Sequence, residues 1–207
     1  MAQHIDNVAL SQLPRLEKDE FYASIYGGDL LFCAAASGIG KVIEEETHSP
    51  FSHVGMCWTT PWLAEWMFLE AVFPQGVRLS KLADYIDGYD GDLVLARRPT
   101  LTQAQIETEL STGFYLVGEA YDWIEEVSIA VRKIKLFSWL PDIKPSKEKY
   151  CSALIQADAL KTIPYKVPGP DWATPEQIYT DPSVEAVGTL LKYVQPRETV
   201  RLECRAA

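Results

Sequence analysis

The sequence predicts an α+β fold, in which helices pack on one mainly antiparallel sheet. Segments typical of strands are concentrated in the first half of the chain, whereas helical spacing of apolar residues dominates from residue 102 onward. The chain has 207 residues, 47% of them hydrophobic, which is enough for one substantial core, and it contains no internal repeat. We therefore expect a single domain over residues 1–207, with residues 1–20 as a mobile N-terminal segment.

The expected strands are bounded by turn-forming residues. The first strand follows Gly27 and Gly28 and is nearly all apolar, as a strand buried on both faces would be. The second and third flank residues 60–63, where Pro61 suits the second position of a tight turn, so they are predicted to form a hairpin. Strands are expected at residues 29–35, 52–59, 65–73 and 92–97, with a last one at 199–204.

The expected helices follow from the spacing of apolar residues and from the residues that precede them. Thr102 is a suitable N-cap, and Pro145 with Ser146 is a good entry signal for a later helix. Helices are expected at residues 37–47, 79–86 (one or two turns), 102–117, 121–137 and 147–161.

Charge and composition exclude several classes of function. The formal net charge of -10 repels phosphate backbones, so nucleic acid is not an expected partner. No apolar run approaches the roughly 20 residues that span a bilayer, and the N-terminus lacks a signal-peptide pattern, so we expect a cytoplasmic protein that does not span a membrane. The four cysteines form no CxxC pair and the three histidines show no metal-ligand spacing, so we expect no metal and no other cofactor.

Cys151 is the candidate nucleophile. It lies near the start of the helix expected at residues 147–161, and a helix N-terminus or a nearby imidazole lowers the pKa of a thiol. The pattern alone leaves another interpretation open, because Cys151 shares an apolar stripe with Leu154 and Ile155 and would also suit a small core residue.

His53 is the candidate base, and Glu70 is its candidate partner. A turn centred between Pro61 and Trp62 places His53 directly opposite Glu70, with their Cβ atoms about 5 Å apart on one face. The carboxylate then accepts a hydrogen bond from one imidazole nitrogen and leaves the other nitrogen as the base. A surface pair without a catalytic role fits this pattern equally well, and His48 is the reserve candidate for the base.

Four stretches of the chain, taken in order, carry a family resemblance. They are GDLLF at 28–32, THSPFSHVGM at 47–56, LEAVFPQGVRLSKLADY at 69–85 and KYCSALI at 149–155. Together they resemble the circularly permuted NlpC-type papain-like cysteine hydrolases, of which the YiiX-like proteins are one branch. The resemblance implies a circularly permuted papain-like fold.

The same resemblance assigns roles to particular residues. It implies a catalytic triad in which Cys151 is the nucleophile, His53 is the base and Glu70 orients the histidine, in the permuted order histidine, glutamate, cysteine. It also implies that Tyr150 lines the substrate site and that the tail at residues 174–187 packs near it. The helices expected between residues 102 and 137 depart from the family pattern and are a candidate substrate cap.

The expected activity is that of a cysteine amidase or peptidase, which cleaves an amide or ester bond through an acyl-enzyme. The expected substrate is a small peptide, a muropeptide or an N-acyl or lipid compound. Two alternatives remain open at this point: an acyltransferase or lipid-active relative, and a non-catalytic module that binds a peptide or lipid. The sequence leaves the oligomeric state open.

Overall fold

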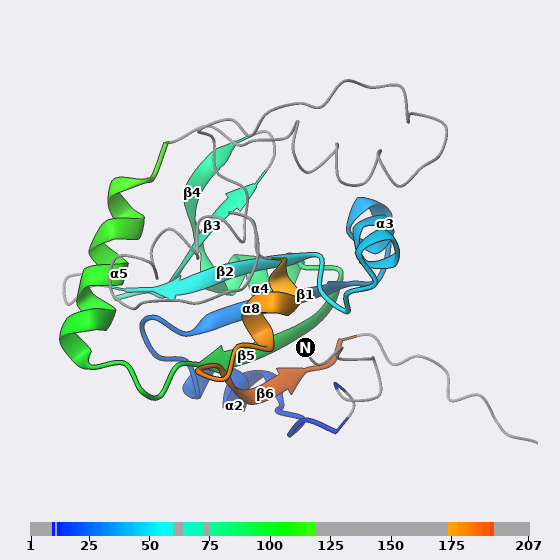
Figure 1. Ribbon diagram of the computed structural model, residues 1–207, viewed down its shortest axis with the longest axis horizontal. Helices are drawn as coiled ribbons and strands as arrows, with labels where there is room; N and C mark the ends of the chain where they lie inside the picture. The colour runs from blue at the N-terminus through cyan, green and yellow to red at the C-terminus, as the bar shows by residue number, and fades with distance from the viewer. Residues whose placement is uncertain (1–9, 11, 60–63, 73–74, 119–173, 193–207) are drawn as a thin grey trace, which may run out of the picture.

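An antiparallel sheet forms the centre of the protein in a computed structural model (Figure 1). The structure describes residues 10, 12–59, 64–72, 75–118 and 174–192. Within these residues the strand order is β4-β3-β2-β1-β5-β6, and neighbouring strands are antiparallel. The strands are β1 (Leu30–Ala35), β2 (His53–Trp58), β3 (Met67–Val72), β4 (Gly76–Lys81), β5 (Gly91–Arg97) and β6 (Glu185–Leu190).

Helices cover both faces of this sheet. Leu110 of α5 and Ile178 of α8 pack on one face, whereas Phe21 of α2 and Leu82 of α4 pack on the other. Burial on both sides explains why β1 reads as a nearly continuous apolar run. The helices are α2 (Lys18–Ala23), α3 (Gly38–Thr47), α4 (Leu82–Gly88), α5 (Gln103–Tyr115) and α8 (Pro175–Tyr179).

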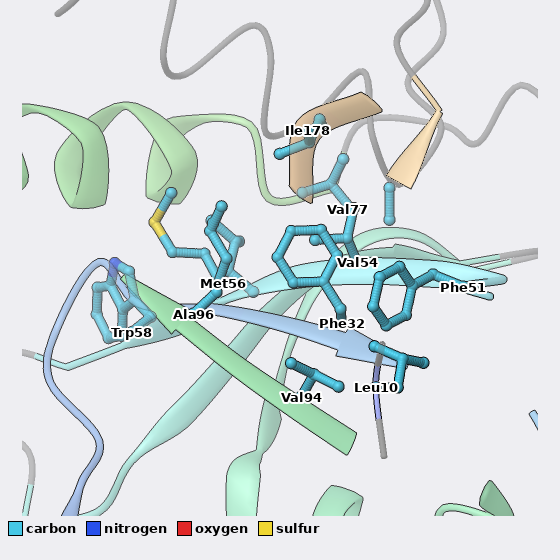
Figure 2. Close-up of a cluster of buried hydrophobic side chains, with 13 residues drawn as sticks. Leu10, Phe32, Phe51, Val54, Met56, Trp58, Val77, Val94, Ala96 and Ile178 are labelled. Atoms are coloured by element: carbon cyan, nitrogen blue, oxygen red, sulfur yellow. The ribbon is translucent and has the colours of Figure 1, made fainter. Parts of the chain in front are cut away.

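The core on the α5 and α8 face is rich in aromatic rings. The ring of Phe32 on β1 has its centroid 5.2 Å from that of Phe51 and 5.2 Å from that of Tyr179. Figure 2 shows Ile178 of α8 over the same face of the sheet, with Phe32 and Val54 from neighbouring strands beneath it. These contacts fix the loop that leads into β2, because Phe51 lies two residues before the first residue of that strand.

Most expected elements within the described residues are confirmed. The strands expected at 29–35, 52–59, 65–73 and 92–97 and the helices expected at 37–47 and 102–117 match observed elements to within two residues at each end. Thr102 is the N-cap of α5, and its Oγ1 accepts a hydrogen bond from the backbone N-H of Gln105. The elements expected at 121–137, 147–161 and 199–204 lie outside the described residues.

One expected helix is confirmed only in part. Residues 79–86 were expected to form helical turns, but Leu79 lies in strand β4 and helix α4 begins only at Leu82. Leu79, Leu82 and Ile86 have helical spacing, which conceals the alternation of apolar and polar residues from Val77 to Ser80. The sheet therefore has an edge strand beside β3 that the sequence analysis did not predict.

The hairpin of β2 and β3 is confirmed, but its expected register is wrong by two residues. Met56 lies opposite Leu69 and Trp58 lies opposite Met67, whereas the expected turn would have placed Met56 opposite Met67. A shift of two residues keeps every side chain on its expected face, because side chains alternate with a period of two. His53 is therefore a diagonal neighbour of Glu70 rather than its direct partner.

The N-terminal segment is anchored to the sheet where the structure describes it. The backbone N-H of Leu16 donates to the carbonyl of Thr189 at 2.9 Å, and the N-H of Thr189 donates to the carbonyl of Pro14 at 2.8 Å. These contacts place Pro14 to Leu16 beside β6. The expectation of a mobile segment at residues 1–20 stays a prediction. In the part of the chain that the structure describes, no helix has the length and apolar character needed to cross a membrane.

Candidate active site

His53 is the first residue of β2, and the chain before it is firmly held. Helix α3 ends at Thr47, and its C-cap His48 has a φ of 53°, in the left-handed region that often terminates helices. Ser52 then donates its backbone N-H to the carbonyl of Cys33 at 3.0 Å, which starts the pairing of β2 with β1. Cys33 is the residue directly opposite His53 in that pairing. The backbone of His53 is therefore held in place at the start of β2.

The imidazole of His53 meets the carboxylate of Glu70. Nε2 of His53 lies 3.0 Å from Oε2 of Glu70, and the side chains are 16% and 1% exposed, respectively. An ionised carboxylate can only accept hydrogen bonds, so Nε2 carries the proton in the neutral imidazole. Nδ1 is the imidazole nitrogen that takes no part in the contact with Glu70. The pair that the sequence predicted is present, although it spans a diagonal of the hairpin.

Two residues of β4 hold the second oxygen of Glu70. Arg78 donates to Oε1 from Nε at 3.0 Å and from Nη2 at 2.8 Å, and Ser80 Oγ donates to the same oxygen at 3.2 Å. Arg78 is the direct cross-strand partner of Glu70 in the pairing of β3 with β4. Both oxygens of this buried carboxylate are therefore engaged, one by His53 and the other by β4.

These contacts decide the protonation state of Glu70. Burial acts to raise the pKa of the carboxyl group, but the hydrogen bonds and charges of His53 and Arg78 outweigh it, so the pKa is lowered from its ordinary value. Glu70 is therefore ionised at neutral pH and can orient the imidazole and stabilise its protonated form.

The face of the sheet that carries His53 has a second group of polar side chains. Sγ of Cys33 lies 3.3 Å from the hydroxyl of Tyr85 on α4, and burial raises the pKa of that phenol well above its ordinary value. The ring of Phe68 contacts both parts of this face, with its centroid 4.3 Å from that of Tyr85 and 6.2 Å from that of His53. The imidazole of His53 therefore has an aromatic neighbour in an edge-to-face arrangement.

Helix α3 supplies a buried carboxylate near the start of β2. Oε1 of Glu44 accepts a hydrogen bond from the backbone N-H of Ala35 at 2.6 Å, and Lys41 Nζ lies 3.2 Å from Oε2. Burial raises the pKa of Glu44 despite these contacts and a hydrogen bond with Ser52. Glu44 therefore ties α3 to the end of β1 and to the residue that precedes His53.

Of the four expected site residues, His53 and Glu70 lie in the part of the chain that the structure describes. His53 and Glu70 come together, and it is His53, not the reserve candidate His48, whose imidazole contacts Glu70; His48 is exposed at the end of α3. Cys151 and Tyr150 lie outside the described residues, so their assignments stay predictions. The helical tail within residues 174–187 is α8, which packs on the opposite face of the sheet from His53.

Arg78 and Ser80 are site residues that sequence reasoning missed. Their signal was the alternation in Val77-Arg78-Leu79-Ser80, which is typical of a strand and places the two polar side chains on one face. Had β4 been recognised, the pairing of Glu70 with Arg78 would have followed from the hairpin of β3 and β4.

A comparison with protein families matches residues 24–198 to the family described as "Permuted papain-like amidase enzyme, YaeF/YiiX, C92 family". The chain belongs to this family. The match includes His53, Glu70 and their surroundings and runs through the region of Cys151. Membership makes the protein an enzyme of the cysteine-hydrolase type, as the sequence analysis expected. Among curated proteins, none matches the chain.

A solved structure confirms the fold. The chain is similar to YiiX from Escherichia coli O157:H7, which is described as a metalloprotein, with a TM-score of 0.57, 20% identity and coverage of 78% of this chain and 96% of that one. At this identity the likeness establishes the permuted papain-like fold alone. In the part of our chain that the structure describes, no three histidine, cysteine, aspartate or glutamate side chains are grouped to hold a metal ion.

Proposed function

We propose that the protein is a cysteine amidase that uses Cys151, His53 and Glu70 as a catalytic triad and passes through an acyl-enzyme. The observation that carries the proposal is the contact of 3.0 Å between His53 Nε2 and Glu70 Oε2. This contact leaves Nδ1 as the nitrogen that exchanges a proton with a nucleophile. The family resemblance supplies Cys151 as that nucleophile.

The reaction has two halves, and His53 moves the proton in both. In the first half, His53 Nδ1 takes the thiol proton while Cys151 sulfur forms a bond to the carbonyl carbon of the amide. The C-N bond then breaks, and the imidazolium returns the proton to the leaving amine. In the second half, His53 deprotonates a water molecule that attacks the thioester, and the C-S bond breaks to release a carboxylic acid and restore the thiol.

Glu70 contributes by orientation and charge. Its ionised carboxylate holds the proton on Nε2 and stabilises the imidazolium that forms twice in each cycle. Backbone N-H groups at the start of the helix expected for Cys151 are the candidates for stabilising the oxyanion. The substrate class that fits this proposal is a small peptide, a muropeptide or an N-acyl compound with a hydrolysable amide.

A thiol-directed probe tests the activated cysteine. We would measure the rate of alkylation at neutral pH in a Cys204→Ala background, because Cys33 and Cys57 are buried in the core. We expect labelling to be located at Cys151 by mass spectrometry, to be abolished by Cys151→Ala, and to slow in His53→Ala by on the order of 10²-fold. The matched control is His48→Ala, which removes an exposed imidazole at the end of α3 and should leave the rate unchanged.

Turnover of model compounds distinguishes the amidase from its alternatives. We expect release of a carboxylic acid from N-acyl amino compounds or short peptides, with loss of release in Cys151→Ala. Equal alkylation rates for the wild type and His53→Ala would contradict the activated thiol. Ligand binding that is unchanged in Cys151→Ala, without any turnover, would indicate a non-catalytic binding module instead.

A further inference from the structure

Glu70 carries a second ionic partner that the proposed chemistry does not use. We propose that Arg78 is a positioning residue that fixes Glu70 and offsets its charge, so that His53 remains neutral and able to accept a proton at neutral pH. This inference rests on the proposed function for its catalytic meaning, since it concerns the readiness of His53 as a base.

The geometry gives Arg78 a different task from that of His53. Both of its donors, Nε and Nη2, point to Oε1 of Glu70, while Oε2 is left for the imidazole. A guanidinium with two donors on one carboxylate restricts its orientation more than a single contact can. The side chain of Arg78 is 40% exposed, whereas Glu70 is 1% exposed, so the arginine brings a solvent-facing positive charge to a buried negative one.

The charges of Glu70 and Arg78 together influence whether the imidazole of His53 is protonated. A buried carboxylate next to an imidazole favours the protonated imidazole, which cannot act as a base. A positive charge on the other oxygen of the same carboxylate opposes that effect, because it reduces the net negative charge that the imidazole experiences. Arg78 therefore limits how strongly Glu70 retains a proton on His53.

The other ionisable groups around His53 come from four elements. Glu70 on β3 and Arg78 on β4 are charged, and Cys33 on β1 lies directly opposite the histidine. Tyr85 of α4 contacts Cys33, and burial together with nearby negative groups raises the pKa of its phenol, so it is neutral at the pH values of interest. Among the described residues that surround the imidazole, Arg78 is the cation in contact with Glu70.

Nuclear magnetic resonance titration of the imidazoles tests this role without any assay of activity. The chain has three histidines, so the His53 resonance can be assigned from a His53→Gln variant. The test variant is Arg78→Gln, whose amide can still donate to Oε1 but carries no charge. Ser80 and the burial of Glu70 keep the carboxylate in place in this variant. We expect the pKa of His53 to rise by about one pH unit.

Two further variants make the test specific. Arg78→Lys retains the charge and should leave the pKa of His53 near its wild-type value, although the two-donor contact is lost. Lys81→Gln removes a positive charge from the same strand, where it pairs with exposed Glu65 rather than with Glu70, and should shift the pKa far less than Arg78→Gln. If Arg78→Gln does not fold, Arg78→Met serves as the second neutral variant.

The outcomes separate this inference from the proposed function. A rise in the His53 pKa in Arg78→Gln, absent in Lys81→Gln, supports the inference; an unchanged or lowered pKa overturns it. If the triad is also correct, the acidic limb of Cys151 alkylation moves upward by the same amount in Arg78→Gln. A shifted imidazole pKa with a cysteine that is never activated would reject the triad while leaving the role of Arg78 toward His53 intact.

Discussion

Glu70 reaches His53 across a diagonal because the residue between them has no side chain. Continuing the register in which Met56 lies opposite Leu69 places Glu70 opposite Gly55, two residues after His53 on the same face. A Cβ added to Gly55 would lie 2.4 Å from Cζ of Phe68, which is closer than carbon atoms can approach. The glycine thus leaves room for Phe68 beside the imidazole and for the contact between His53 and Glu70.

We predict that Gly55→Ala destabilises the protein and disturbs the site. The new methyl group would also lie 2.7 Å from the carbonyl oxygen of Leu69, a backbone atom that cannot rotate away. We expect a loss of about 1–3 kcal/mol in the free energy of unfolding, measured by urea denaturation. The control is Gly88→Ala, where nothing lies within 4 Å of the added Cβ, and which should be neutral or slightly stabilising. Equal stabilities for the two variants would contradict this packing account.

We predict that Glu70→Gln slows alkylation of Cys151 at neutral pH by on the order of 10²-fold. The amide has the shape of the carboxylate but carries no charge to stabilise an imidazolium. Its NH2 group is a donor, yet it would face His53 or Arg78, which are donors themselves. The control is Glu65→Gln, which removes an exposed carboxylate that pairs with Lys81 outside the site. If both variants react at the wild-type rate, Glu70 does not orient the base.

The two buried glutamates near His53 should respond to pH with opposite signs. The pKa of Glu70 is lowered on folding by His53 and Arg78 against the effect of burial, so its ionisation stabilises the protein above the unfolded pKa of about 4.3. That contribution is lost as the pH falls through the lower folded pKa. The pKa of Glu44 is raised by burial, so its ionisation costs stability at neutral pH, and the cost disappears as the pH falls through the raised value.

Urea denaturation of Gln variants between about pH 3 and pH 7 measures both effects. Relative to Glu70→Gln, the wild type should lose stability as the pH falls below about 4.3. Relative to Glu44→Gln, it should instead gain stability as the pH falls from neutral toward about 4.3. If the stability difference between the wild type and each variant changes with pH in the same direction, the pKa values of Glu44 and Glu70 are not shifted in opposite directions.

The parts of the fold that the sequence predicted well depend on local signals. Helix α5 starts where Thr102 satisfies the backbone of Gln105, and β1 and β5 are apolar runs bounded by turns. These features are encoded within a few neighbouring residues. Strand β6 lacked such a signal, because Glu185–Leu190 contains glycine and polar residues and is defined by its pairing with β5, far away in the sequence.

The candidate site shows the same division between local and distant information. Side chains alternate with a period of two along each strand, which placed His53 and Glu70 on the same face. An error of two residues in the register therefore did not change the prediction that they meet. Arg78 could not be placed beside Glu70 once residues 79–86 had been assigned to a helix. Because β4 was not recognised, the site expected from the sequence lacked Arg78, which pairs with Glu70.

A buried ion pair outside the site gives the last prediction. Arg98, just after β5, donates from Nη1 and Nη2 to Glu109 of α5 at 2.9 and 2.5 Å, and the two side chains are 1% and 0% exposed. Arg98 Nη2 also approaches the carbonyl of Gly28 at 3.5 Å. The pair therefore links α5 to the end of β5 and to the turn before β1.

Breaking this pair should be far more costly than breaking an exposed one. Glu109→Gln leaves the Arg98 guanidinium buried without a balancing charge, and we expect a loss of about 3–5 kcal/mol in the free energy of unfolding. Asp87→Asn removes the exposed partner of Lys18 and should cost less than about 1 kcal/mol. The double variant Arg98→Met with Glu109→Leu should recover most of the loss, because neither side chain then carries a charge that needs water. If the double variant is instead as unstable as the sum of Arg98→Met and Glu109→Leu measured singly, the coupling energy is zero and the two charges do not compensate each other.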